Sequence, residues 1–410
     1  MKAEDRTKRW LEDLGSQVFP HVLTRRTDIP LNLGFQELSP GLLTLAPTLF
    51  SLDDQDGAVL RQDLSLGRLV EAGEEGLQLS ASLGFGWSLS WRNLPYSLVN
   101  TATARMALFG EPSSEAFQME LAYCLDEFRR LLAGLRGHAL VVSGLDGIEL
   151  MHDSWLQTPW GRIKSASPME RRISVSGSQA TAILVSEAPV TLSIGSGMEN
   201  FDTEYWSMRE QDLFLLALSC LLAGPTIGSP GVAWTTTLTP GQMGSGGSAR
   251  AQTRAGWGNL VLRETDLGNV STWCSLVESR HHRKLNVAAS RLLRAVRERD
   301  QPDDALVDAV ISLEALFGVG EVSETTFRVS AACARLLEAD LAKRQEVRKR
   351  IADAYGARSR LVHGAQLEAQ DIERHRDAAL SFATEAFRVL LSQRPDLIDS
   401  ENRASVILLE

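Results

Sequence analysis

The residues Tyr355-Gly-Ala-Arg358-Ser359-Arg360-Leu-Val-His363-Gly364 predict the end of a helix that carries an arginine and a histidine five positions apart. On a regular helix this spacing turns the two side chains about 140° away from each other. A glycine just past the last helical residue is a common helix stop, because glycine adopts the left-handed backbone conformation without steric cost. Gly364 therefore predicts that the helix ends here and leaves His363 free to turn back toward Arg358.

The pair of Arg358 and His363 has the chemistry needed to cleave RNA without a metal ion. Attack by the RNA's own 2'-hydroxyl requires a group with a pKa near neutrality to move protons, which histidine supplies. A fixed cation must bind the phosphate and stabilise the charge that develops on it, which suits arginine. The alternative is structural: Arg358 is a solvated side chain, and His363 caps the helix near its negative C-terminal end.

Helical periodicity surrounds this motif. Leucine, alanine and valine recur at three- and four-residue spacing from His281 to Arg299, which predicts one apolar stripe on a basic helix. Pro302 is suited to open a second helix, Ser323 to cap a third, and Pro395 to stop the last one. The predicted bundle has four or five helices. They cover residues 281–299, 302–318, 323–338, 341–361 and 371–392.

From about residue 281 onward the chain resembles the HEPN domains, most closely the Apea-like HEPN group. The motif of that family is an arginine, a residue that is usually polar, three more residues and a histidine. It is matched here by Arg358, Ser359 and His363, although Asn, Asp or His is more typical at the position of Ser359. Three segments in the family's order carry the resemblance: Asp303-Asp-Ala-Leu-Val-Asp-Ala-Val-Ile-Ser-Leu-Glu-Ala-Leu-Phe317, Arg328-Val-Ser-Ala-Ala-Cys-Ala-Arg-Leu-Leu337 and Tyr355 to Gly364.

The resemblance implies an all-α HEPN bundle over residues 276–396 that acts as a metal-independent endoribonuclease without a cofactor. Related sites are often assembled in a homodimer, with an arginine and a histidine from each subunit. The expected substrate is RNA, including tRNA, and the expected setting is antiphage defence or a toxin-like stress response. Other members of the group are binding modules. A catalytically silent dimerisation or RNA-binding bundle that serves an N-terminal ligand-sensing domain is therefore the alternative.

Glu314 lies on an otherwise apolar helical face between Leu313 and Ala315. Buried carboxylates are rare unless they are paired. One hypothesis is that Glu314 pairs with Arg358 in a bidentate contact that directs the guanidinium at the phosphate, which would make it a further site residue. The alternatives are that Glu314 lies at the wet edge of its helix, or that it forms a structural bridge with Arg328 or Arg335.

The net charge of −10 and the pI of about 5.4 argue against a general nucleic-acid coat protein. The basic residues are nevertheless concentrated in two segments, 280–299 and 343–350. Such a local lining can bind a phosphate backbone, and we expect Lys349, Arg350 and Arg360 to contact RNA. The alternative is that both segments are solvated helix faces whose charge nearby acids offset.

Residues 1–270 are expected to form a strand-rich α+β domain of sensing function, open to a regulatory partner or ligand. Leu77, Leu79, Ala81 and Leu83 alternate most clearly with polar residues. Residues 240–250, rich in glycine and serine, predict a linker, and residues 397–410 a C-terminal tail. Strands are predicted within 42–52, 76–91, 139–150, 172–176, 181–186 and 190–194, and helices at 114–135 and 204–223.

Other classes of site are not indicated. The glycines of 240–250 lack the Lys-Ser/Thr ending of a phosphate-binding loop, and no His and acid pair has zinc-ligand spacing. Four scattered cysteines predict buried reduced thiols. The longest apolar run, 213–223, is too short to cross a bilayer, and the charged start has no apolar signal core. We therefore expect a cytoplasmic protein with no metal and no membrane contact.

Overall fold

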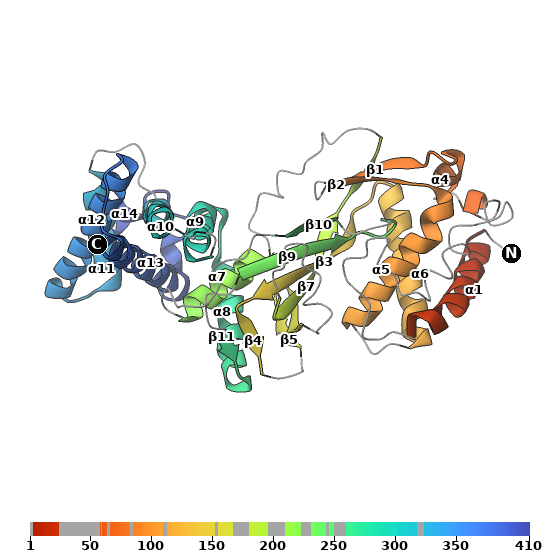
Figure 1. Ribbon diagram of the computed structural model, residues 1–410, viewed down its shortest axis with the longest axis horizontal. Coiled ribbons are helices and arrows are strands. Elements are labelled where there is room, and N and C mark those ends of the chain that lie inside the picture. The colour runs from red at the N-terminus through yellow and green to blue at the C-terminus, as the bar shows by residue number, and fades with distance from the viewer. Residues whose placement is uncertain are drawn as a thin grey trace. The chain divides into compact units, whose positions relative to one another are not determined.

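A computed structural model shows a strand-rich α+β region followed by an all-helical region, as the sequence predicts (Figure 1). It divides into two compact units. Unit 1 contains residues 1–144, 166–206 and 233–250, and unit 2 contains residues 145–165, 207–232 and 251–410. The structure describes residues 3–23, 58, 60–63, 66–82, 85–109, 113–151, 155–166, 180–195, 210–222, 231–242, 246–249, 260–297, 299, 301–317 and 324–410.

The helices of unit 1 share one apolar core. It is built from α1 (Ala3–Leu23), α4 (Gly67–Glu71), the 3₁₀ turn η1 (Trp91–Asn93), α5 (Leu94–Phe109) and α6 (Ser114–Leu132). The predicted helix at 114–135 is confirmed as α6, which Ser113 caps by accepting from the Ala116 N–H. Helix α5 was not predicted, because its polar residues, among them Asn100 and Thr101, are buried together with its apolar ones, and no amphipathic stripe marks the helix.

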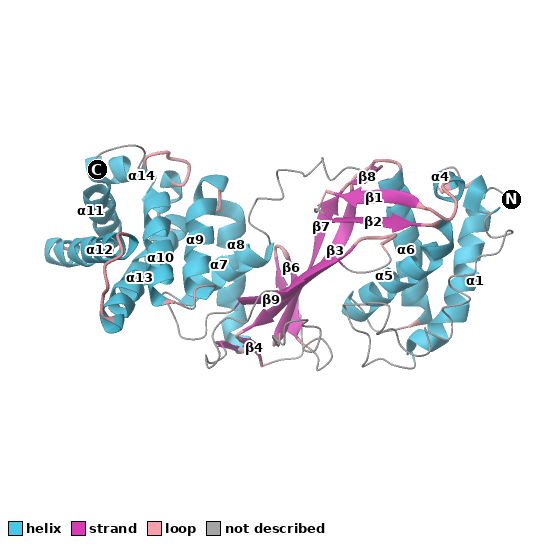
Figure 2. Cartoon of the chain, turned by 45° about the horizontal axis from the view of Figure 1, so that its top comes forward, coloured by secondary structure: helices cyan, strands magenta, loops and turns pink. Residues whose placement is uncertain are grey.

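Two sets of strands complete unit 1. The hairpin of β1 (Leu77–Ala81) and β2 (Phe85–Leu89) pairs Leu79 with Trp87, and β8 (Leu192–Ile194) adds to the other edge of β1. Leu79 and Ala81 are buried, which confirms the predicted alternation. A second set runs in the order β10 (Gly246–Ala249), β9 (Gly231–Leu238), β3 (Gly137–Asp146) and β7 (Ala182–Val190). Figure 1 labels all four strands, and Figure 2 shows β9, β3 and β7 from a second direction.

The predicted linker at 240–250 is wrong for its second half. Residues Gly246–Ala249 form β10, which pairs antiparallel with β9 and places Gly246 opposite Thr237. Runs of glycine and serine are typical of a flexible tether, but a backbone that pairs with a neighbouring strand needs no large side chain. The predicted strands at 42–52 and 172–176, and residues 204–209 of the second predicted helix, lie outside the described residues.

Unit 2 combines short strands with the helical region. Its strands are β4 (Ile148–Leu150), β5 (Leu156–Thr158), β6 (Gly161–Ser165) and β11 (Leu260–Leu262); β5 pairs antiparallel with β6, and β11 pairs parallel with β4. Helix α7 (Glu210–Leu222) also belongs to this unit and packs against α8 (Leu267–Arg280), α9 (Asn286–Arg297) and α13 (Ala369–Ser392). Unit 2 therefore includes segments that precede residue 270.

The five helices predicted after residue 281 are all present. They are α9, α10 (Pro302–Phe317), α11 (Thr325–Leu337), α12 (Leu341–Val362) and α13. The expected start at His281 is wrong, because the extended backbone of His281 ends α8, and the turn η5 (Arg283–Leu285) precedes α9. The N-cap residue of α11 is Glu324, with a φ of +70°, and not the expected Ser323, which is outside the described residues.

The segment expected to be a tail begins at the end of the turn η6 (Pro395–Leu397) and contains helix α14 (Arg403–Leu409), which packs against α11 and α10. Arg403 is only 2% exposed, and it donates both to carbonyls of the residues just before α14 and to a carbonyl of α10. Its Nη1 donates to Ile398 at 2.9 Å and to Ser400 at 2.8 Å, and its Nε donates to Leu316 at the end of α10. Residues 397–410 are thus tied into the helical bundle.

Candidate functional site

The end of α12 is held by a Schellman motif. The Gly364 N–H donates to the Leu361 carbonyl at 2.9 Å, and the Ala365 N–H donates to the Arg360 carbonyl at 2.9 Å. Gly364 has a φ of +81°, the left-handed conformation that this motif requires. The predicted helix stop at Gly364 is confirmed, and His363 becomes the exposed C-cap residue.

Within one chain, Arg358 and His363 do not lie on the same face. The His363 N–H still donates to the Ser359 carbonyl at 3.1 Å, so the backbone remains helical up to His363 and does not turn back. The two side chains therefore keep the divergence of about 140°. Arg358 is half-buried, whereas His363 and Ser359 are exposed.

Arg358 lies near Glu314 of α10 and Tyr355 of its own helix. Burial raises the pKa of the Glu314 carboxyl, and the charge of Arg358 acts in the opposite direction. Burial, followed by the charge of Glu314, raises the pKa of Tyr355. These effects place the three side chains in one partly desolvated cluster.

The bidentate contact expected between Glu314 and Arg358 is absent. No hydrogen bond and no ion pair within 4.0 Å joins these two described residues, and the buried Arg358 Nε and Tyr355 hydroxyl have no hydrogen-bond partner in the described part of the chain. The first alternative partner is also engaged elsewhere, because Arg328 donates to Ser405 and, at 3.4 Å, to Asn402. Glu314 thus acts on Arg358 through charge and not through a direct bond.

Three exposed side chains share the opposite face of α12. Arg360 and His363 follow Lys349 by 11 and 14 residues, which places all three within about 60° around the helix. Arg350 lies to one side, with its guanidinium carbon 5.1 Å from the centroid of the Phe382 ring on α13. The structure therefore places His363 beside Arg360, on the face that also carries Lys349 about 21 Å along the helix, and separates it from Arg358.

A second histidine, which was not predicted as a site residue, lies next to this face. His375 of α13 is half-buried, and its pKa is lowered by burial and then by the charge of Arg374. Asp353 and Arg360 of α12 also act on it, so it lies close to the exposed stripe of α12. The only signal in the sequence was the position of His375 near the start of the predicted helix 371–392, which follows the Arg358 to His363 motif.

The two basic segments have different roles. In 280–299 the cations form structural contacts: Arg291 and Arg299 each contact the buried Asp308 at 2.6 Å, and Arg280 donates to the Ser392 carbonyl at 3.1 Å. In 343–350, Lys343, Arg348 and Lys349 are exposed. The first segment therefore contributes to the structure, and the second leaves its cations exposed. Neither the interpretation as an RNA-binding lining nor that as solvated helix faces describes both segments.

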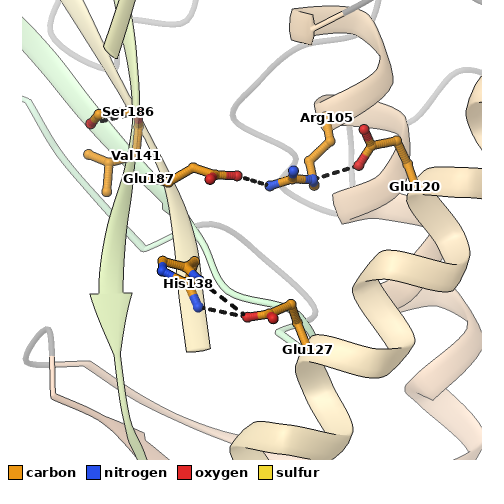
Figure 3. Close-up of polar contacts among 7 residues, drawn as sticks. All are labelled: Arg105, Glu120, Glu127, His138, Val141, Ser186 and Glu187. Atoms are coloured by element: carbon orange, nitrogen blue, oxygen red, sulfur yellow. Dashed lines mark hydrogen bonds and ion pairs between the residues drawn. The ribbon is translucent and has the colours of Figure 1, made fainter. Parts of the chain in front are cut away.

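Unit 1 has a partly buried polar cluster (Figure 3). Arg105 of α5 donates to Glu120 of α6 at 2.6 Å and to Glu187 of β7 at 2.7 Å. Burial alone would lower the pKa of Arg105, but the hydrogen bonds to both carboxylates outweigh it and raise the pKa. Glu127 accepts from the His138 backbone N–H at 2.9 Å. The Arg105 contacts join two helices to a strand, a structural role.

The remaining expectations concern thiols, metals and membranes. All four cysteines are free and buried, as expected, and burial raises the pKa of Cys220 and Cys274 to about 12. Within the described ranges, no three His, Cys, Asp or Glu side chains gather where a metal ion would bind. None of the described helices is both long and apolar enough to cross a bilayer.

Comparisons with known proteins give no relative for this chain. No protein-family model, no curated protein and no solved structure matches it.

Proposed function

We propose that the C-terminal helical region is a metal-independent endoribonuclease of the HEPN type. The observation that carries the proposal is the exposed imidazole of His363, which the Schellman motif holds at the end of α12 beside Arg360. A histidine in such a place can exchange protons with a bound RNA strand. The Arg358 to His363 motif and its resemblance to HEPN domains support this choice of reaction.

In the proposed reaction His363 accepts the proton of the RNA 2'-hydroxyl, and the resulting oxygen attacks the adjacent phosphorus. The bond to the 5'-oxygen breaks, and that oxygen takes up a proton from solvent water, while His363 gives the proton that it accepted back to solvent. The products are a 2',3'-cyclic phosphate and a 5'-hydroxyl. A guanidinium beside the phosphate stabilises the charge that develops on its oxygens.

Because Arg358 and His363 diverge within one chain, we propose that a homodimer supplies both to one phosphate. Arg358 of one protomer then acts with His363 of its partner. Val362, which is 58% exposed and adjoins His363, is suited to such a contact between copies. In this proposal the protein is cytoplasmic and acts in antiphage defence or a stress response, and unit 1 restrains the nuclease until it binds a ligand or partner.

The test is incubation of the full-length protein with total RNA and tRNA in EDTA, followed by analysis of fragment size and 3'-end chemistry. We expect the wild type to leave cyclic phosphates and the Arg358→Ala and His363→Ala variants to leave the RNA intact. Matched controls are Arg9→Ala and His138→Ala, at exposed positions of unit 1. Cleavage by His363→Ala at the wild-type rate would refute the proposal.

A second candidate is a catalytically silent RNA-binding bundle, favoured by the divergence of Arg358 and His363 within the chain. A binding module would leave RNA intact in every lane, and its affinity would fall steeply as salt is added, since phosphate contacts release counterions. An enzyme would produce cyclic-phosphate ends. The same RNA samples therefore distinguish the two candidates.

A further inference from the structure

An exposed aromatic ring and an arginine form a stacked pair between α11 and α12. Phe327 of α11 is 52% exposed, and the guanidinium carbon of Arg348 lies 5.4 Å from the centroid of its ring. Leu341, at the start of α12, is 67% exposed. Single exposed apolar residues are ordinary, but a ring held in place by a cation is a preformed stacking surface.

The charge of α12 is opposite to that of the whole protein. The helix contains seven Lys or Arg residues and two acids, while the chain carries a net charge of −10. No carboxylate lies within 4.0 Å of the side-chain nitrogens of Lys343, Arg348 or Lys349 among the residues that the structure describes, and Glu346 is the acid on this segment. These cations are therefore available to an anionic partner.

We infer that Phe327, Arg348 and Lys349, here called the Phe327 surface, bind single-stranded RNA. One unpaired base extends the Phe327 and Arg348 stack, and the cations contact the flanking phosphates. A duplex hides the faces of its bases, so the exposed ring favours a single strand. This inference rests on the proposed function, since it names the form of RNA that the His363 site receives.

The geometry of α12 connects the Phe327 surface with His363. The 15 residues from Arg348 to His363 span about 22 Å along the helix. Lys349, Arg360 and His363 share one exposed face along this length. A strand bound at Phe327 would thus be guided by cations toward the imidazole, over a distance of several nucleotides.

The test measures binding of a fluorescent 12-nucleotide single-stranded RNA by full-length protein that carries His363→Ala. We expect Phe327→Ala to weaken the affinity about 5-fold to 150-fold, since one stacked base contributes about 1–3 kcal/mol. Phe327→Tyr should restore the affinity. Val287→Ala is the matched control, because Val287 is a 60% exposed apolar residue on α9, and it should leave binding unchanged. Circular dichroism checks that each variant is folded.

Unchanged affinity of folded Phe327→Ala would overturn the inference, and so would competition by duplex RNA equal to that by single strands. Equal competition by polyglutamate would also overturn it and would indicate an acidic protein partner. Cleavage by wild-type protein is scored separately. Stacking-dependent binding with no cleavage refutes only the proposed function, whereas cleavage without a contribution of Phe327 refutes only this inference.

Discussion

Asp308 shows how one side chain can account for part of a basic segment that looked suited to RNA. Its carboxylate, 2% exposed on α10, contacts Arg291 and Arg299 at 2.6 Å each. A buried carboxylate with two charge-assisted contacts is costly to disturb, because the neutral amide leaves both arginines without their anion. The neighbouring Asp304 is exposed in the first turn of the same helix and contacts neither arginine.

We expect Asp308→Asn to lower the free energy of unfolding by about 2 kcal/mol. Asp304→Asn, the matched control, should lower it by no more than about 0.5 kcal/mol, through the loss of a favourable charge at the helix N-terminus. Urea unfolding followed by far-ultraviolet circular dichroism measures both. Equal effects of the two substitutions would contradict the structural role of Asp308.

His281 predicts a dependence of stability on pH. Its Nε2 contacts the Asn286 Oδ1 at 2.7 Å, and its buried Nδ1 has no hydrogen-bond partner in the described residues. Burial lowers the pKa of this imidazole below the unfolded value of 6.5. The unfolded chain then binds the proton more readily than the native one, so this contribution to stability is complete above pH 6.5 and is lost as the pH falls.

His281→Gln removes the titrating group while its side-chain amide can still donate to Asn286. We expect the urea midpoint of the wild type to fall more between pH 7 and pH 5 than that of the variant. Identical pH dependence in both proteins would show that the burial of His281 has no energetic consequence.

At the scale of the element, one glycine inside α12 and one just past its end have opposite requirements. Gly364 needs a positive φ of +81°, whereas Gly356 lies inside the helix, and a methyl group added there would meet no atom within 4 Å. We expect Gly364→Ala to cost about 1 kcal/mol and Gly356→Ala to add about 0.5–1 kcal/mol of stability. Thermal unfolding of both variants checks the two signs, and a stabilising effect of Gly364→Ala would contradict the motif.

The elements were predicted from sequence where a pattern was strong and local. The stripe of α9, the stop at Gly364 and the alternation of Leu79 and Ala81 depend on neighbours within a few residues, and the structure confirms them. Helix α5 was missed because it is buried all round, polar residues included, and β10 because its glycine and serine residues carry no strand pattern. The burial of α5 and the pairing of β10 are decided by tertiary contacts and not by local sequence pattern.

At the scale of the whole molecule, α7 makes the helical region depend on a distant segment. Its residues Phe214, Leu215, Leu216 and Leu218 are buried, and α7 packs against α8, α9 and α13. Removal of α7 exposes the apolar faces that these helices turn toward it, at a cost of about 1.5–3 kcal/mol for each large side chain.

We therefore expect a fragment of residues 260–410 to unfold at a lower temperature than a fragment with residues 207–232 joined ahead of it by a Gly-Ser linker. Differential scanning calorimetry compares the two fragments. Equal melting temperatures would show that the helices after residue 260 are stable without α7.

The sequence by itself determined the order of strand-rich and helical regions, the helices after residue 281 and the stop at Gly364, because each depends on local periodicity or backbone conformation. The tertiary structure decided which charged side chains are engaged within the protein and which remain available to an anionic partner. It engaged Arg291 and Arg299 with Asp308, separated Arg358 from His363, and left Arg348 stacked on the exposed Phe327. Partners distant in sequence are chosen by packing, which one chain's residue pattern does not specify.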